Sequence, residues 1–299
     1  MIDAFSRRIL DIHGATGQQW LDRLPTLLRE CEQRWSITIE APFAALSYNY
    51  VAPARATDGS PLVVKLGVPN PELLAEIEAL RLFDGNGTVR LIDGDPNQGI
   101  LLLEHASPGT PLMALPDDAE STSIASKVMR QLWCPAPAHD VFPTLTRWFR
   151  SLRQLRKIYD GKTGPLPSLL VEAAERSSAE LIASTASPML LHGDLHHENV
   201  VAAERQPWLA LDPKGVIGDP AFEVGPWLHN VAQQILAARP LKETMDRRVR
   251  QFAEELGFDR ERIRSWGLSH AVLSACWSLE DHGEGWEWPI LCAETLAHL

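Results

Sequence analysis

The chain has 299 residues, a hydrophobic fraction of 45% and 22% charged side chains, which fits a globular protein with one large domain or two lobes. Its net charge of −11 argues against a nucleic-acid partner, because phosphate contacts need a basic surface. The sequence contains no run of about 18 apolar residues, the length needed to cross a membrane. The N-terminus has no signal-peptide pattern, so we expect a cytoplasmic protein. The four cysteines are scattered, and we expect free thiols.

The chain up to residue 104 predicts a small sheet with helices. The first 45 or so residues read as helical, with a strand near Ser36–Glu40. Asn70-Pro71 is a good helix start, and Gly85 a stop. Asp58-Gly59 is a hairpin signal between two of the expected strands. Those further strands are Tyr48–Ala52, Pro61–Leu66, Val89–Ile92 and Ile100–Leu103.

After Glu104 the chain reads as mostly helical, with Pro-rich breaks at 108–116, 135–143 and 165–167. Two short apolar strands, Met189–Leu191 and Trp208–Leu211, interrupt this pattern. The order predicts an α+β protein with a small β-rich lobe at 1–104 and a larger, mainly α lobe at 105–299.

Three polar residues follow the two late strands. Asp194 comes after the first strand, where a carboxylate could accept a hydroxyl proton. Asn199 lies five residues further on, and Asp212 follows the second strand. A hairpin turning at Ala203–Pro207 would bring Asp212 beside Asn199, giving two oxygen ligands of the kind that Mg²⁺ accepts. The pattern predicts phosphoryl transfer, which depends on positioning and charge neutralisation.

A lysine and a glutamate in the first lobe complete the pattern. Lys65 ends an apolar strand, and Glu76 follows eleven residues later on the next helix. That order suits a Lys–Glu pair that positions phosphate.

Simpler interpretations remain open for these residues. Asp194 and Asn199 are also common loop-capping residues, and Lys65 could be an ordinary surface lysine. His192, His196, His197 and Glu198 could be read as a zinc cluster. However, they lie between two short strands, with no H-E-x-x-H on a helix.

The motif His192-Gly193-Asp194-Leu195-His196, followed by Asn199, resembles the catalytic loop of the aminoglycoside phosphotransferase family, which has a protein-kinase-like bilobal fold. Asp212-Pro213-Lys214-Gly215 takes the place of the metal-binding Asp motif, and Gly218-Asp219-Pro220 follows. The sequence from Trp208 to Asn230 is similar to that of the streptomycin 6-kinase branch of the family. Members of this branch are also described as aminoglycoside/hydroxyurea resistance kinases.

The resemblance implies ATP and Mg²⁺ as cofactors and a role for each matched residue. Asp194 would be the catalytic base, Asn199 and Asp212 would hold Mg²⁺, and Lys65, supported by Glu76, would contact the nucleotide phosphates. Leu103–Ala106 would form a hinge in which Glu104 and Ala106 bind adenine. The loop near Ser47 would cover the phosphates, although it lacks G-x-G-x-x-G. Asp219 would be structural and brace the catalytic loop.

A small cationic acceptor is the substrate that the branch implies, with the 6-hydroxyl of streptomycin as the first candidate. Carboxylates suit such a ligand, and Glu280–Trp288 interleaves four acids with two indoles around glycines that indicate a loop. The expected acceptor residues are Glu223, Asp281, Glu284 and Glu287. An acidic turn with its tryptophans packed inward is the plain structural alternative.

Two other functions stay open at this point. One is a kinase for another small alcohol or for hydroxyurea. The other is a non-catalytic kinase fold that acts as a binding protein, against which the intact set of Lys65, Asp194, Asn199 and Asp212 argues.

Overall fold

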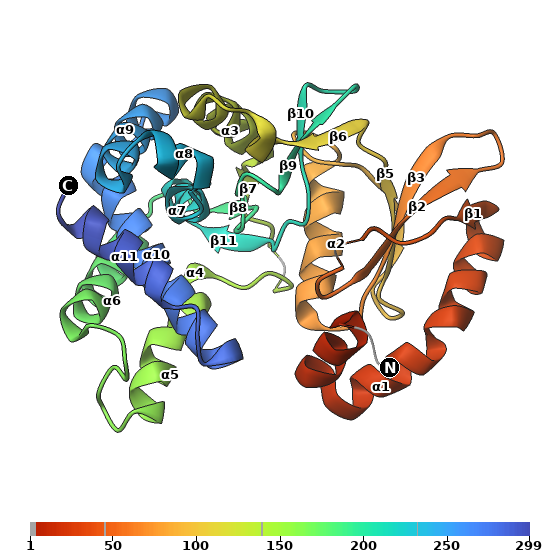
Figure 1. The fold of residues 1–299 in the computed structure, drawn as a ribbon, viewed down its shortest axis with the longest axis horizontal. Helices are drawn as coiled ribbons and strands as arrows, with labels where there is room; N and C mark the ends of the chain where they lie inside the picture. Colours follow the sequence, from red (N-terminus) through yellow and green to blue (C-terminus); the bar gives the residue numbers. More distant parts are fainter. Residues whose placement is uncertain (1–3, 45, 139, 232) are drawn as a thin grey trace.

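The structure, a computed structural model, describes residues 4–44, 46–138, 140–231 and 233–299. A sheet-containing N-terminal part and a helical C-terminal part lie side by side (Figure 1). Among the helices in these ranges, none combines the length and the apolar character that a bilayer crossing requires. The α+β, protein-kinase-like arrangement expected from the sequence is confirmed.

The N-terminal part is built on a five-stranded sheet in the order β1-β2-β3-β5-β4. The Asp58-Gly59 turn joins β2 to β3, with Gly59 at φ 86° and the Asp58 carboxylate accepting the Ser60 N–H at 2.9 Å. The strands are β1 (Ile37–Ile39), β2 (Tyr50–Ala56), β3 (Pro61–Leu66), β4 (Leu91–Asp95) and β5 (Ile100–Glu104).

β2 and β4 differ most from the sequence prediction in their bounds. The sequence predicts a strand at Tyr48–Ala52, which stops before a proline that cannot donate to a sheet ladder. In the structure β2 continues through Pro53, whose carbonyl accepts the Glu40 N–H at 2.8 Å. β4 begins two residues later than expected and carries a register shift against β5 between Leu91 and Asp93.

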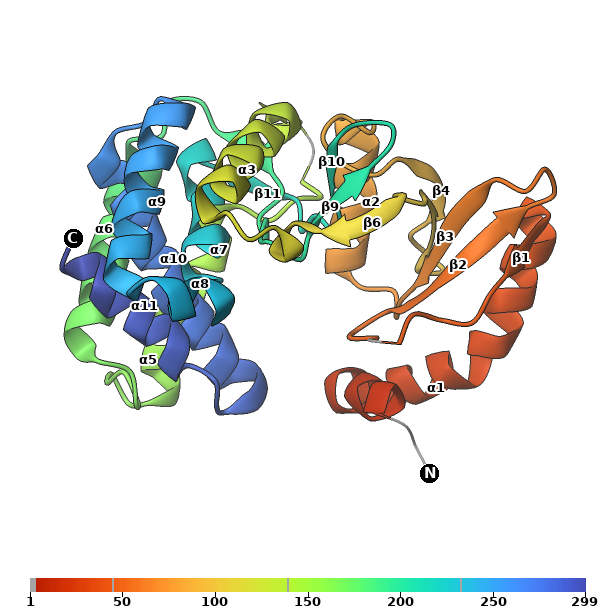
Figure 2. The ribbon, with the colours of Figure 1, turned by 45° about the horizontal axis from the view of Figure 1, so that its top comes forward.

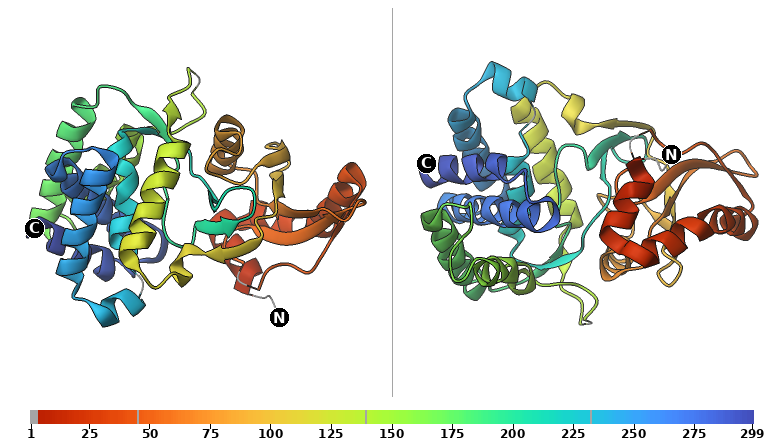
Figure 3. Two further views of the ribbon diagram at one scale, coloured as in Figure 1. Left: turned by 90° about the horizontal axis from the view of Figure 1, so that it is seen from above. Right: turned by 60° about the horizontal axis from the view of Figure 1, so that its bottom comes forward.

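Two helices flank the sheet. α1 (Ala4–Trp35) bends at Gly14, at φ 53°, and packs Trp20 and Leu27 into a core shared with β3. α2 (Pro71–Phe83) begins as expected, because the Asn70 side chain accepts the Leu73 N–H at 2.9 Å, and it ends in a left-handed residue at Asp84. α2 lies on the side of the sheet that faces the C-terminal part (Figures 1 and 3).

The C-terminal part encloses the larger core, formed mainly by α3, α6, α7, α9, α10 and α11. Its helices are α3 (Asp118–Leu132), α4 (Leu145–Trp148), α5 (Arg150–Ile158), α6 (Ser168–Ala183), α7 (Val224–His229), α8 (Gln233–Ala238), α9 (Leu241–Leu256), α10 (Arg260–His282) and α11 (Glu287–Ala297). Two 3₁₀ turns, η1 (Leu112–Ala114) and η2 (Pro220–Glu223), complete it.

Two small sheets carry the functional motifs. Their orders are β10-β9-β6 and β11-β8-β7. The strands are β6 (Pro108–Pro111), β7 (Cys134–Pro135), β8 (Met189–Leu191), β9 (Val200–Ala203), β10 (Trp208–Ala210) and β11 (Val216–Gly218). The expected hairpin is present as β9–β10, and these strands lie between the two parts of the molecule (Figure 2). The sequence prediction missed β6, β7 and β11. The prolines of β6 and β7 read as breaks.

Candidate active site

Lys65, Glu76 and Asp212 come together where β3 and α2 face the C-terminal part. The Lys65 Nζ lies 2.6 Å from Glu76 Oε1 and 3.0 Å from Asp212 Oδ1. The side chains of Lys65 and Glu76 are buried, whereas that of Asp212 is 55% accessible. Burial acts to lower the pKa of Lys65, but the two carboxylates outweigh it and raise that pKa. Lys65 therefore carries a fixed positive charge between the two carboxylates.

Asp212 keeps its negative charge in this arrangement. Burial acts to raise the pKa of Asp212, but the Lys65 ammonium outweighs it, so the net pKa is lowered. Its backbone is left-handed, at φ 57°, an uncommon conformation for a side-chain-bearing residue that Asp tolerates better than most. One oxygen of the carboxylate lies beside the buried ammonium, and more than half of the side-chain surface stays accessible.

The loop after β8 holds Asp194 and Asn199 in one unit. The Asn199 Nδ2 donates to the Asp194 carbonyl at 2.9 Å, and the Leu211 N–H donates to the Asn199 carbonyl at 2.8 Å. The Asn199 side-chain oxygen is therefore the atom left for a ligand. Asp194 keeps 37% of its side-chain surface accessible, and His196 Nε2 lies 3.9 Å from its Oδ1.

The environment of Asp194 makes it a stronger base than a free aspartate. Loss of hydration raises the pKa of its carboxyl, and the positive charge of Lys214 only partly opposes this. A carboxylate with a raised pKa on an accessible loop suits proton acceptance from a substrate hydroxyl.

His192 fastens the loop to the neighbouring strand. Its Nε2 lies 2.7 Å from the Leu211 carbonyl, and its Nδ1 accepts the Asp194 N–H at 3.2 Å. Burial lowers the pKa of His192 to about 3, so the ring is neutral. Within the described residues, no three His, Cys, Asp or Glu side chains gather as metal ligands. The zinc interpretation therefore has no support.

The expectation that Glu223 binds the acceptor is wrong, because its side chain does not reach the surface. Its side chain is fully buried, and its two oxygens accept the N–H groups of His192 at 2.7 Å and Gly193 at 2.8 Å. It therefore holds the start of the catalytic loop and has no surface to offer an acceptor.

Asp219 also differs from expectation. It is buried and structural, but it caps η2 through the Ala221 N–H, accepts the Trp266 Nε1–H at 2.6 Å and pairs with Arg262. The bracing of the loop that we assigned to Asp219 belongs to Glu223.

The sequence and the fold resemble those of known proteins. The family model described as aminoglycoside/hydroxyurea antibiotic resistance kinase matches residues 34–282. The chain belongs to this family. It is 34% identical to a streptomycin 6-kinase of Streptomyces glaucescens, over 90% of this chain and 87% of the relative. It is also 34% identical to a hydroxyurea phosphotransferase of Kitasatospora aureofaciens, over 90% and 77% respectively.

The fold of this resistance-kinase family member is shared with aminoglycoside phosphotransferase APH(4)-Ia, solved in a ternary complex with ADP and hygromycin B. The TM-score is 0.60 at 13% identity, covering 91% of this chain and 97% of that one. The family match and the 34% identity to a streptomycin 6-kinase show that the kinase is a phosphotransferase, and the interpretation as a non-catalytic binding protein is set aside.

In the kinase, the expected adenine hinge follows β5. The Glu104 side chain is occupied, because Arg205 binds it with two bonds of 2.7 and 2.8 Å and the Arg90 N–H donates at 3.0 Å. The Glu104 N–H is also occupied, because it donates to the Arg90 carbonyl at 2.9 Å. A contact of Glu104 with a base would therefore have to come from its carbonyl. Ser47 lies on an exposed loop just before β2. These three nucleotide contacts stay predictions.

The expected acceptor segment of the kinase is less of a loop than its glycines indicated. Glu280 and Asp281 lie in the last turn of α10, Gly283 caps that helix at φ 72°, and α11 begins at Glu287. Within the segment Glu280–Trp288, only residues 283–286 lie outside helices. The exposed Asp281, Glu284 and Glu287 stay candidates for acceptor binding.

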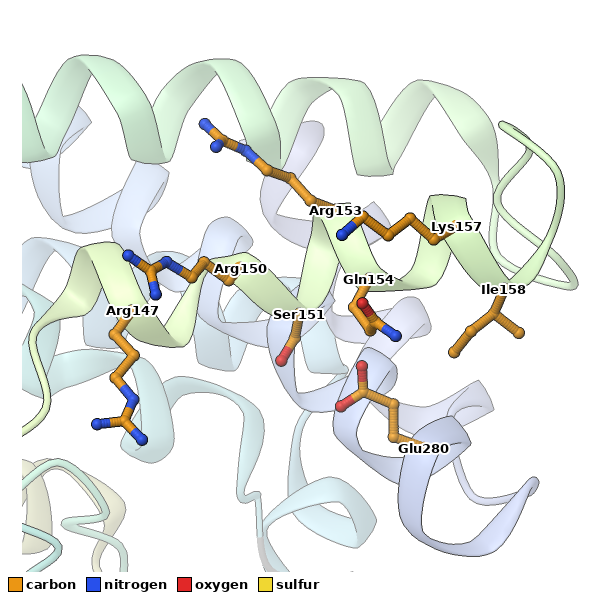
Figure 4. A pocket seen from close by; sticks show the side chains of 8 residues that line it. All are labelled: Arg147, Arg150, Ser151, Arg153, Gln154, Lys157, Ile158 and Glu280. Atoms are coloured by element: carbon orange, nitrogen blue, oxygen red, sulfur yellow. The ribbon is translucent and has the colours of Figure 1, made fainter.

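The two indoles of this segment differ in exposure, because Trp288 keeps part of its ring at the surface. Trp286 is half-buried against the main core, and the Trp288 Nε1 donates to the His229 carbonyl at 2.8 Å. Glu280 points into a groove beside α5 (Figure 4). The groove is otherwise lined mainly by basic and polar side chains: Arg147, Arg150, Ser151, Arg153, Gln154 and Lys157. That surface does not favour a cation at Glu280.

Several structurally important residues carried no local signal in the sequence. Glu223 acts 30 residues away from Gly193, and Arg205 pairs with Glu104 across 101 residues. The third case is the ion pair between Asp118 and Arg248, which lie 130 positions apart. This pair connects to the same catalytic loop. Arg248 lies in a helix that is rich in charged residues, so nothing in its neighbourhood along the chain distinguishes it.

Proposed function

We propose that this kinase transfers the γ-phosphoryl group of ATP to a hydroxyl of a small acceptor, with the 6-hydroxyl of streptomycin as the first candidate. The observation that carries the proposal is the accessible Asp194 carboxylate beside the Lys65–Asp212 pair, joined to it through Asn199 and Leu211. The similarity to a streptomycin 6-kinase over 90% of the chain supports the choice of acceptor.

The residues fit a magnesium–nucleotide complex. The Asn199 side-chain oxygen and the Asp212 carboxylate are hard oxygen donors of the type that Mg²⁺ prefers. Lys65 supplies the fixed cation for phosphate oxygens. When bound, Mg²⁺ would neutralise charge on the nucleotide phosphates.

Asp194 has the role of proton acceptor in this proposal. The acceptor oxygen forms a bond to the γ-phosphorus while the bond from that phosphorus to the β–γ bridging oxygen breaks. The hydroxyl proton passes to the Asp194 carboxylate, and ADP leaves with the bridging oxygen. Glu223 and His192 hold the backbone of the loop, so that Asp194 needs little rearrangement to reach the hydroxyl.

Hydroxyurea is the second candidate acceptor, because the similarity to a hydroxyurea phosphotransferase is also 34% over 90% of the chain. The basic groove at Glu280 agrees better with this neutral acceptor than with a cation at that position.

The test is ATP consumption by the purified kinase with streptomycin, other aminoglycosides and hydroxyurea in parallel, against Asp194→Ala. We expect streptomycin to stimulate turnover only in the wild type, and phosphorus NMR of the product to place the phosphate at the 6-hydroxyl. Stimulation by hydroxyurea alone selects the second candidate. If no acceptor raises turnover above the Asp194→Ala control, the resistance function is wrong.

A further inference from the structure

Arg248 lies in the middle of α9 with its side chain fully buried. A buried guanidinium is costly unless its N–H groups are paired and its charge is balanced. The charge is balanced by Asp118 in the first turn of α3, with Nη2 to Oδ1 at 2.6 Å. A second side of the guanidinium is held by the Trp227 carbonyl of α7, at 2.6 Å from Nη1.

A third contact reaches the catalytic loop. The Arg248 Nη2 also lies 3.1 Å from His197 Nε2. Since a guanidinium can only donate, this imidazole nitrogen must be the acceptor and the ring proton must sit on Nδ1. Arg248 thus fixes both the orientation and the tautomer of His197.

Two more contacts hold His197 in place. Its ring stacks on Trp227 with centroids 3.6 Å apart and planes at 22°, and its carbonyl accepts the Met113 N–H at 3.2 Å. His197 lies between the two residues that the proposed mechanism uses, three positions after Asp194 and two before Asn199. Because these residues are so close along the chain, a displacement of the His197 ring would also displace Asp194 and Asn199.

We propose that Arg248 is a positioning residue for phosphoryl transfer, which sets the catalytic loop through His197. This inference rests on the proposed roles of Asp194 and Asn199. A misplacement of about 1 Å in a catalytic group can cost about 100-fold in rate. The alternative is that Arg248 only joins α3, α7 and α9 and has no effect on the loop.

Arg247 provides a matched control for the two alternatives. It lies next to Arg248 on α9 and pairs with the same Asp118, but its other bond goes to Gln251 and not to the catalytic loop. Arg247→Met removes one cation from Asp118 and leaves the contact with His197 in place.

Substitutions of His197 carry the test, because Arg248→Met would leave Asp118 with a buried, less compensated charge and could unfold the chain. His197→Leu removes the acceptor for Arg248. His197→Gln places a side-chain oxygen near the position of Nε2 and restores it. Steady-state kinetics with the stimulating acceptor, thermal melting and amide hydrogen exchange at residues 194–199 would be measured for wild type, both His197 variants and Arg247→Met.

We expect His197→Leu to lower kcat by about 10- to 100-fold, with the KM for ATP within twofold and faster exchange in the loop. His197→Gln should recover most of that loss, and Arg247→Met should match the wild type. If His197→Leu keeps kcat within twofold, or if Gln restores nothing, the proposal is wrong. Hydrogen exchange needs no acceptor, so an unchanged loop would overturn this inference even where the proposed function had failed, and a changed loop would support it.

Discussion

At the scale of single residues, the Asp194 carboxyl determines how the rate depends on pH. Its surroundings raise its pKa above the ordinary value of 3.8, mainly through loss of hydration. The proposed mechanism needs the ionised form, which is lost as pH falls through that raised pKa. We therefore expect kcat/KM to fall on the acid side, with a midpoint above that of a solvated aspartate, in a pH–rate profile between about pH 4 and 8.

The control for this profile is a variant in which the carboxylate is absent. Asp194→Asn should lower kcat by at least about 100-fold, the lower range for general base catalysis, and its residual rate should show no acid limb of this midpoint. A wild-type rate that is flat down to pH 4 would contradict the assignment of Asp194 as the base.

Glu223 links the stability of the fold to pH in the opposite direction. Burial raises the pKa of Glu223 from 4.5 to about 7, although the N–H groups of Gly193 and His192 oppose the shift. Because the folded pKa is above the unfolded one, this group contributes full stability below about pH 4.5, and that contribution is lost as pH rises through about 7.

A stability comparison tests this linkage. Glu223→Gln cannot ionise, and it loses one of the two acceptor oxygens, so it should be less stable than the wild type by about 1–3 kcal/mol at pH 5. The difference should shrink as pH rises to 8, because only the wild type loses the contribution of a protonated carboxyl. Urea unfolding at both pH values measures this, and a gap that widens with pH would contradict the sign.

At the scale of elements, the turn between β8 and the catalytic loop depends on Gly193. Its φ is 85°, and an added Cβ would lie 2.8 Å from Trp148 Cη2 and 2.9 Å from Val216 Cγ1. Gly193→Ala should therefore both strain the backbone and push the loop away from α4. We expect a loss of about 1–3 kcal/mol in stability and a fall in kcat.

Gly59 supplies the matched control for Gly193. Its φ is 86°, in the β2–β3 turn, and nothing lies within 4 Å of an added Cβ. Gly59→Ala should cost stability through the same backbone strain but leave kcat unchanged in steady-state assays. Equal effects of the two substitutions on kcat would show that the contacts of Gly193 with Trp148 and Val216 have no role in catalysis.

Elements could be predicted from the sequence where the signal is local. The start of α2 at Asn70 and the Asp58-Gly59 turn depend on neighbouring residues only, and both are confirmed. β2 continues through Pro53 in register with β3, and the Pro53 carbonyl accepts the N–H of Glu40 from another segment. Periodicity carries no information about such a partner, so the predicted strand ended too early.

In the candidate site, too, local sequence signals were predictive and contacts between distant segments were not. Lys65, Glu76, Asp194, Asn199 and Asp212 stood out because chemistry and spacing coincide, and the structure places them together. The bracing of the loop by Glu223 and the network of Arg248 depend on contacts across 30 or more residues. Only the packed molecule shows which buried charge meets which backbone group.

At the scale of the whole molecule, the unanswered question is which surface receives the acceptor. The net charge of −11 favours cations in general, yet the groove at Glu280 is basic (Figure 4). The candidates left for a cationic acceptor are the exposed carboxylates after that groove, Asp281, Glu284 and Glu287. A local binding site predicts that the KM for streptomycin rises only when charge is removed from that site. The overall electrostatic field of the protein predicts the same rise when equal charge is removed elsewhere.

We expect neutralisation of the local candidates, with Asp281→Asn and Glu284→Gln together, to raise the KM for streptomycin by about 10-fold or more, the value of one charge-assisted contact. The KM for ATP should stay within twofold. Glu243→Gln with Glu254→Gln is the control, because it removes the same charge from exposed positions of α9. If both double variants raise the KM for streptomycin equally, the effect comes from the overall field, and if neither does, the segment after α10 is not part of the acceptor site.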